Sequence, residues 1–381
     1  MNFLISKKII GIKYFFSKKY LIYKMIERYK KSVELDPKDA DAWINLGDAY
    51  YDENKYDYAI ESYQKAIEIN PYFSEVWNNL GLAFSMMRQY KEAIKCYQEA
   101  LKIEPDDAIA YYNLGFAHED LEEYDEALKI YKIALEYDPG YTDVWNNIAL
   151  IYKANEQYDK AIKWYEKALN INPDEALLYN NLAIIYYNIQ NYDEAIRYYK
   201  KALDLDPYNA ELWFDLGDVV YERNDYDLAI KCYKKATELN PYFVEAWNNL
   251  GLSHTFKENF KESIECYEKA LNLQSEDAIL YENLAISYSA LKDFDNAIIY
   301  FLNTLRVDPD NANTHKKLGE IYCEVKNEYQ KALIHFKKGV SLDPSDLVFW
   351  ESIALCFQKL GQPEKAKEWN ERHFKWQLEN K

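Results

Sequence analysis

Large side chains recur along this chain with a period of 34 residues. An aromatic residue marks each period, and we number every repeat so that this residue is position 4. It is Trp43, Trp77, Tyr111, Trp145, Tyr179, Trp213, Trp247 and Tyr281. His315 lies one period further along, and Trp350 follows after 35 residues. A constant period of this length predicts a solenoid, in which each supersecondary unit packs only against its neighbours.

The other large apolar residues of a repeat stand at positions 7 and 11, as Leu46 and Tyr50 do in the first repeat. Spacings of three and four residues place them on one helix face together with position 4. Positions 8, 20 and 27 are small, position 24 is aromatic, and a proline closes most repeats. Because helices approach closely only where the facing residues lack bulk, each repeat predicts two helices in contact.

These positions carry a resemblance to a known family. The second repeat reads Trp77-Asn78-Asn79-Leu80-Gly81, followed by Tyr90, Ala93, Tyr97, Ala100 and Pro105. This pattern resembles the tetratricopeptide repeat, and it covers residues 40–346 as nine repeats. The resemblance implies an all-α fold, a right-handed superhelical solenoid of helix-turn-helix units.

The ends of the array depart from the pattern, as the ends of solenoids do. We predict a basic amino-terminal segment with a degenerate half-repeat over residues 1–39. Residues 347–381 predict a degenerate tenth repeat followed by a capping helix. Repeat nine carries one extra residue before Tyr329, which we assign to the turn between its two helices.

Charge is distributed unevenly along the chain. Residues 1–31 carry a net charge of +8 and the remaining residues carry −26, so the whole chain has a net charge of −18. An array this acidic repels phosphate backbones, so nucleic acid is not an expected partner. Neutral or basic peptides and proteins fit better. The five cysteines form no CxxC pair, which indicates a reducing compartment and no metal site.

Residues 1–24 contain six lysines among Ile, Phe, Leu and Tyr, and no acid. One interpretation is a cationic amphipathic helix that contacts an anionic membrane or targets an organelle. The other is a degenerate first repeat or an unstructured tail of biased composition. The lysines interrupt every apolar run, so no stretch reaches the length of a membrane span.

Position 6 lies outside the core-facing stripe, on the face that lines the concave groove in the tetratricopeptide family. A neutral amide offers both a donor and an acceptor, which suits the main chain of an extended peptide. Asparagine recurs at position 6 in most repeats and forms a ladder along the array. This ladder resembles the asparagine ladder of the O-linked N-acetylglucosamine transferases, and it also agrees with ordinary repeat consensus. We predict these peptide-binding residues: Asn45, Asn79, Asn113, Asn147, Asn181, Asp215, Asn249 and Asn283.

Other recognised sites are missing from the sequence. The carboxylate clamp for chaperone tails needs lysine at position 5 and asparagine at position 9, and no repeat from one to eight has that pair. No HExxH, GxSxG or glycine-rich phosphate loop is present, so we expect no cofactor, no metal and no enzymatic activity.

We therefore predict a non-enzymatic, cytoplasmic scaffold or adaptor that binds an extended peptide or protein in its concave groove. Two alternatives stay open. One is a substrate-recruiting arm associated with a glycosyltransferase, and the other is a membrane- or organelle-anchored assembly factor that uses residues 1–24. Self-association of the array is a further option, because near-consensus repeats stack end to end.

Overall fold

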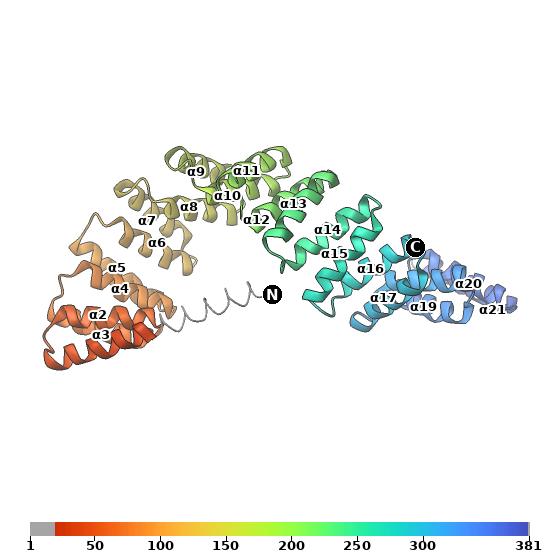
Figure 1. Cartoon of the computed structure of the whole chain (residues 1–381), viewed down its shortest axis with the longest axis horizontal. Helices are drawn as coiled ribbons and strands as arrows, with labels where there is room; N and C mark the ends of the chain where they lie inside the picture. Colours follow the sequence, from red (N-terminus) through yellow and green to blue (C-terminus); the bar gives the residue numbers. More distant parts are fainter. Residues whose placement is uncertain (1–19, 380–381) are drawn as a thin grey trace. The chain divides into compact units, whose positions relative to one another are not determined.

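The computed structural model describes residues 20–379, and all regular structure within that range is helical. The chain divides into two compact units, residues 1–178 and 179–381. Within each unit, each helix packs against the next one along the chain, as the hairpin pairs in Figure 1 show. The all-α prediction is confirmed, and the helix pairs are packed as in a tetratricopeptide solenoid.

The described part of the first unit begins with a helix over residues 20–35. Four helix pairs follow, in which the first helix of each repeat has an even label and the second an odd label. They are α2 (Ala40–Asp52), α3 (Tyr56–Ile69), α4 (Ser74–Met86), α5 (Tyr90–Ile103), α6 (Ala108–Asp120), α7 (Tyr124–Tyr137), α8 (Thr142–Ala154) and α9 (Tyr158–Ile171).

Helix α10 (Ala176–Asn188) contains the division between the units, and the second unit continues in the same order. Its further helices are α11 (Tyr192–Leu205), α12 (Ala210–Glu222), α13 (Tyr226–Leu239), α14 (Val244–Phe256), α15 (Phe260–Leu273), α16 (Ala278–Ala290), α17 (Phe294–Val307), α18 (Ala312–Glu320), η1 (Ile321–Val325), α19 (Tyr329–Leu342), α20 (Leu347–Lys359) and α21 (Pro363–Glu379).

Polar side chains begin and end these helices. Asp107 caps α6 by accepting hydrogen bonds from the backbone N–H groups of Ile109 and Ala110. The turn between the two helices of a repeat places its middle residue in the left-handed region, for example Asn54 at φ 59° and Asn224 at φ 59°. Arg88, Glu122 and Gln190 adopt the same conformation in their repeats, so the short turn requires neither asparagine nor glycine.

The recurring tryptophan has a second role besides filling the core. Its indole N–H donates a hydrogen bond to the carbonyl of the proline that closes the preceding repeat. The distances are 3.1 Å from Trp43 to Pro37, 2.9 Å from Trp77 to Pro71, and 2.8 Å from Trp145 to Pro139. The bond joins one repeat to the next, which is a reason for tryptophan rather than phenylalanine at position 4.

The contact between the two helices of a repeat depends on a small residue at position 8. A Cβ atom at Gly115 would lie 2.6 Å from the ring of Tyr131 at position 24. Tyr131 is fully buried. In repeat five, Ala183 takes the position-8 place opposite Tyr199, so a methyl group is accommodated there. The predicted close helix contact is therefore present.

The extra residue of repeat nine lies inside its first helix. After α18 the backbone continues as the π-helical segment Ile321–Val325, and three residues then connect it to α19. The connection has the same length as in other repeats, and Asn327 keeps the left-handed conformation at φ 55°. Our assignment of the extra residue to the turn was wrong, because a wider helical turn absorbs one residue without disturbing the loop.

The predictions for the amino-terminal segment fall mostly outside the described residues. Of residues 1–24, only 20–24 are described, and they lie in the helix over residues 20–35. Within the described part of the chain, no helix has both the length and the apolar character needed to cross a membrane.

Candidate functional site

The predicted ladder lies on a surface that we call the first-helix face, formed by positions 5, 6, 9 and 12 of the first helices. Asn45 is exposed, whereas Asn113 and Asn181 are only 9% exposed. The remaining ladder residues are half-buried. Most ladder side chains therefore lie between neighbouring repeats, and only part of each one reaches the surface.

Most ladder amides donate their N–H groups to acceptors within the protein. Except for Asn45, whose bond is local, these hydrogen bonds join consecutive repeats. The acceptors are Asp41 O for Asn45 (2.6 Å), Asp48 Oδ1 for Asn79 (3.4 Å), Asn78 Oδ1 for Asn113 (2.9 Å), Tyr131 Oη for Asn147 (3.1 Å), Asp218 Oδ1 for Asn249 (3.0 Å) and Asn248 Oδ1 for Asn283 (3.1 Å). Each of these bonds uses one of the two N–H groups of its amide, and all but that of Asn45 are repeat-to-repeat contacts.

Repeats five and six break this arrangement. Asp215 occupies the ladder position in repeat six and has no amide hydrogen to donate. The position-5 residue of the preceding repeat is Asn180, which corresponds to Asn78 and Asn248 elsewhere. Its Oδ1 atom is buried and accepts no hydrogen bond. A junction that elsewhere contains a donor and an acceptor therefore contains two acceptors here.

Carboxylates accumulate on the same face. Burial raises the pKa of Asp48, Glu119 and Asp218, although each accepts a tyrosine hydroxyl that partly offsets the effect. The donors are Tyr63 to Asp48 (2.7 Å), Tyr131 to Glu119 (2.6 Å) and Tyr233 to Asp218 (2.7 Å). Burial, followed by the charges of Asp218 and Glu211, raises the pKa of Asp215 to about 6.

These four carboxylates lack a cationic partner. Within residues 20–379, neither lysine nor arginine forms an ion pair with Asp48, Glu119, Asp215 or Asp218. Asp48 also lines a small hollow of about 160 Å³ together with Tyr51, Asp52 and Asn79. Asp48 is exposed, whereas Glu119, Asp215 and Asp218 are half-buried. A half-buried carboxylate that lacks a counter-charge is costly to the protein alone, and a bound cationic group would relieve that cost.

The acids at positions 9 and 12 were not among our predicted site residues. Asp48 and Asp218 occupy the same place in repeats one and six, where most repeats have an apolar residue. That departure from the repeat pattern was visible in the sequence. Its significance depends on the tyrosine hydroxyls and ladder amides around it, which only the packed helices reveal.

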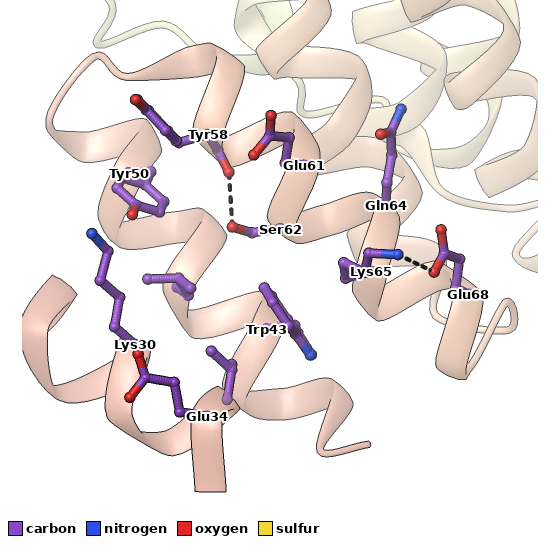
Figure 2. A pocket seen from close by; sticks show the side chains of 12 residues that line it. Lys30, Glu34, Trp43, Tyr50, Tyr58, Glu61, Ser62, Gln64, Lys65 and Glu68 are labelled. Carbon is purple, nitrogen blue, oxygen red and sulfur yellow. Dashed lines mark hydrogen bonds and ion pairs between the residues drawn. The ribbon is translucent and has the colours of Figure 1, made fainter. Parts of the chain in front are cut away.

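A second hollow lies between the second helices of neighbouring repeats. It has a volume of about 590 Å³, and its floor is formed by Trp43, Leu46 and Tyr50 of α2. One wall is the helix over residues 20–35, through Lys30, and the other is α3, through Ser62. Figure 2 shows Lys30, Tyr50 and Trp43 around this opening, with Ser62 directed back to the carbonyl of Tyr58 at 2.7 Å.

A similar hollow of about 400 Å³ occurs one repeat further along. Its floor consists of Trp77, Leu80 and Phe84 of α4, and Cys96 of α5 lies in its wall. Gln64 and Glu68 of α3 border both hollows. We call the pair the outer grooves, because they open between second helices and are separate from the first-helix face.

An array of paired helices with hydrogen bonds between consecutive repeats defines a helical-repeat scaffold. Family models agree with this class. Models of the tetratricopeptide repeat match residues 26–52, 47–87, 89–122 and 108–141. A model described as the C-terminal domain of cilia and flagella-associated protein 70 matches residues 141–316. The chain belongs to the tetratricopeptide repeat family, and it is accordingly a protein-interaction scaffold, a class that is generally non-enzymatic.

Solved structures show similar folds. The C-terminal part of a tetratricopeptide repeat protein from Cytophaga hutchinsonii is 18% identical, with a TM-score of 0.56, and the match covers 64% of this chain and 99% of that chain. MamA is 26% identical over 45% of this chain and 94% of its own, with a TM-score of 0.43. YrrB, described as having an unusual peptide-binding site, is 25% identical over 48% of this chain and 95% of its own, with a TM-score of 0.42. No curated protein matches this chain.

Proposed function

We propose that the first-helix face binds an extended peptide segment of a partner protein, and that this segment carries lysine or arginine. The junction between repeats five and six supports this most directly. There, Asp215 and the Oδ1 atom of Asn180 are both acceptors, and no residue of the described chain supplies a hydrogen to Asn180. An ammonium or guanidinium group supplies several N–H donors and a positive charge at once.

The other ladder residues would contribute by a different route. Because one N–H group of each amide is used between repeats, the other N–H group and the carbonyl oxygen would meet the C=O and N–H groups of a peptide main chain. The carboxylates Asp48, Glu119 and Asp218 add negative charge along the same face. Modest contacts in many repeats then add up to a specific interaction without one deep pocket.

A selection from a random peptide library on the purified full chain tests this proposal. We expect the selected peptides to be enriched in lysine and arginine. Binding of a selected peptide should fall by about tenfold or more in the double variant Asp215→Asn and Asp218→Asn, since one charged contact is worth about 1.5–3 kcal/mol. The variant Asp204→Asn makes the same change on exposed α11 and should leave binding unaltered.

Two results would contradict the proposal. One is a set of peptides without basic residues. The other is equal loss of binding in the Asp204→Asn control, which would indicate a general charge effect. Circular dichroism would verify that each variant keeps its helical content.

A further inference from the structure

The surface between neighbouring second helices differs from repeat to repeat at one residue. This residue is position 23 of the repeat, which lies in its second helix. In several repeats this residue is an aromatic ring that lies over the ring at position 4 of the same repeat. The centroid distances are 5.2 Å for Trp164 over Trp145, 6.3 Å for Tyr198 over Tyr179, 6.3 Å for Tyr300 over Tyr281, 5.2 Å for His335 over His315 and 5.5 Å for Trp369 over Trp350. In these repeats the protein fills its own groove.

Repeats one and two lack this ring. Position 23 is Ser62 in the first and Cys96 in the second, and both side chains are buried and too small to cover the position-4 ring. These are the two repeats with the hollows of about 590 and 400 Å³. Trp43 and Trp77 form their floors and stay partly exposed. In these two repeats the missing ring coincides with an open groove. In repeat three, where position 23 is Ile130, the Tyr137 ring stacks on the Tyr111 ring at 5.6 Å instead.

Cysteine also stands at position 23 in repeats six and seven, as Cys232 and Cys266. In repeat seven the groove is covered in another way, because the Lys269 ammonium lies 4.3 Å from the centre of the Trp247 ring.

We propose that the outer grooves of repeats one and two bind a partner segment that inserts an aromatic side chain into each. The inserted ring would take the place that Trp164, Tyr198 and Tyr300 take in their own repeats. The protein itself thus shows which chemistry fits between these helices: an indole or phenol stacked on the position-4 ring. A buried aromatic side chain removes about 150–250 Å² from water, so one ring per groove is a substantial anchor.

The rim of the first groove indicates the charge of the partner. Lys65 is paired with Glu68 at 2.6 Å, and Lys30 lies 5.7 Å from the centre of the Tyr50 ring. Glu34 and Glu61 also line the groove, and neither forms an ion pair with a residue of the described chain. The partner that we propose is therefore a peptide in which lysine flanks the aromatic residue, because its charge complements this rim.

A direct test uses the full chain and a capped tripeptide with fluorotryptophan between two lysines, observed by fluorine NMR. We expect binding that weakens about tenfold in the double variant Ser62→Tyr and Cys96→Tyr, equivalent to about 1.4 kcal/mol. These substitutions fill each groove as Tyr198 and Tyr300 do elsewhere. Gln98→Tyr, which adds a ring on exposed α5 outside both grooves, is the control and should bind as the native chain does.

A second variant keeps the test informative if the tyrosines disturb folding. Glu34→Lys with Glu61→Lys should weaken the lysine-flanked probe and strengthen a probe in which glutamate replaces lysine. Equal binding of both probes to all variants, or no binding to the native chain, would overturn the proposal.

The test also distinguishes a partner from the chain's own amino-terminal segment, which is aromatic and basic as well. Changing Phe3, Tyr14, Phe15 and Phe16 to serine in the full chain removes the aromatic residues of positions 1–19. Unchanged probe affinity supports a partner in the grooves. A rise of about fivefold or more would assign the grooves to the chain's own segment and overturn the partner assignment.

Discussion

Two junctions on the first-helix face have the same register but different chemistry. Between repeats two and three, Asn113 donates to Asn78 at 2.9 Å, and both side chains are 9% exposed. Between repeats five and six, Asp215 stands in the place of Asn113 and Asn180 in the place of Asn78, and the Oδ1 atom of Asn180 has no donor. One junction is complete within the protein, whereas in the other the described chain supplies no donor to the Oδ1 atom of Asn180.

This comparison separates structure from recognition in a repeat protein. The residues that agree with the repeat pattern hold the array together, and they do so in the same way at each step. The residues that depart from the pattern leave groups without partners. In a solenoid, such departures are therefore better guides to a binding site than the consensus residues that surround them.

The largest expected effect concerns the ring that both junctions share at position 24. Tyr131 and Tyr199 are 0% and 3% exposed, and we expect each change to alanine to cost about 3–5 kcal/mol of local stability. Hydrogen exchange in the affected repeats measures this cost. A much smaller cost at Tyr199 than at Tyr131 would show that the position-24 ring does not stabilise the two junctions equally.

The next largest effect is the pH dependence of the Asp215 junction. Because the pKa of Asp215 is raised to about 6, the folded state holds this proton more tightly than the unfolded state does. Stability is therefore greatest below about pH 4 and falls as the pH rises to about 6, by about 2–3 kcal/mol for this group. Asp215→Asn should remove this loss and raise stability at neutral pH. Urea unfolding at several pH values measures the free energy of unfolding. If that free energy depends on pH in the variant as it does in the native chain, Asp215 is not the group responsible.

Replacing asparagine by aspartate at the junction between repeats two and three should make it resemble the junction between repeats five and six. Asn113→Asp places a carboxylate against the oxygen of Asn78, and we expect a loss of about 2 kcal/mol at neutral pH that diminishes at acid pH. Asn45→Asp is the matched control, because Asn45 is an exposed ladder residue. Its effect should stay within about 0.5 kcal/mol. A loss of similar size in the control would mean that burial is not the cause.

The smallest expected difference comes from removing each side chain. Asn113→Ala leaves the buried oxygen of Asn78 without its donor and should cost about 1–2 kcal/mol. Asp215→Ala removes an uncompensated carboxylate and should cost less, or stabilise the chain. Thermal unfolding of the two variants at neutral pH measures this difference. The same cost for both would indicate that packing volume, rather than hydrogen bonding, dominates at these junctions.

Much of the fold was predictable because each of its rules is local. The period that begins at Trp43, the small residue at position 8 and the closing prolines define helices, their contact and their turns. The π-helical segment Ile321–Val325 was not predictable in the same way. An inserted residue can be absorbed by a loop or by a wider helical turn, and the repeat pattern does not distinguish between them.

The candidate site was predictable only in outline. The ladder residues were found from their recurrence, yet their hydrogen bonds were not, because a sequence does not show whether an amide faces solvent or the next repeat. Asp48 and Asp218 were visible as departures from the pattern, but the hydroxyls of Tyr63 and Tyr233 that hold them were not.

The repeat period and the side-chain sizes in this sequence are sufficient to specify a tetratricopeptide array, since helix periodicity and close packing act over short distances along the chain. Tertiary structure decides which polar groups find partners. The donor for Asn78 comes from a residue 35 positions away, and the rings that close or open the outer grooves lie on a different helix from the floors they cover. Those outcomes depend on distances across helices, which no local pattern in the sequence contains.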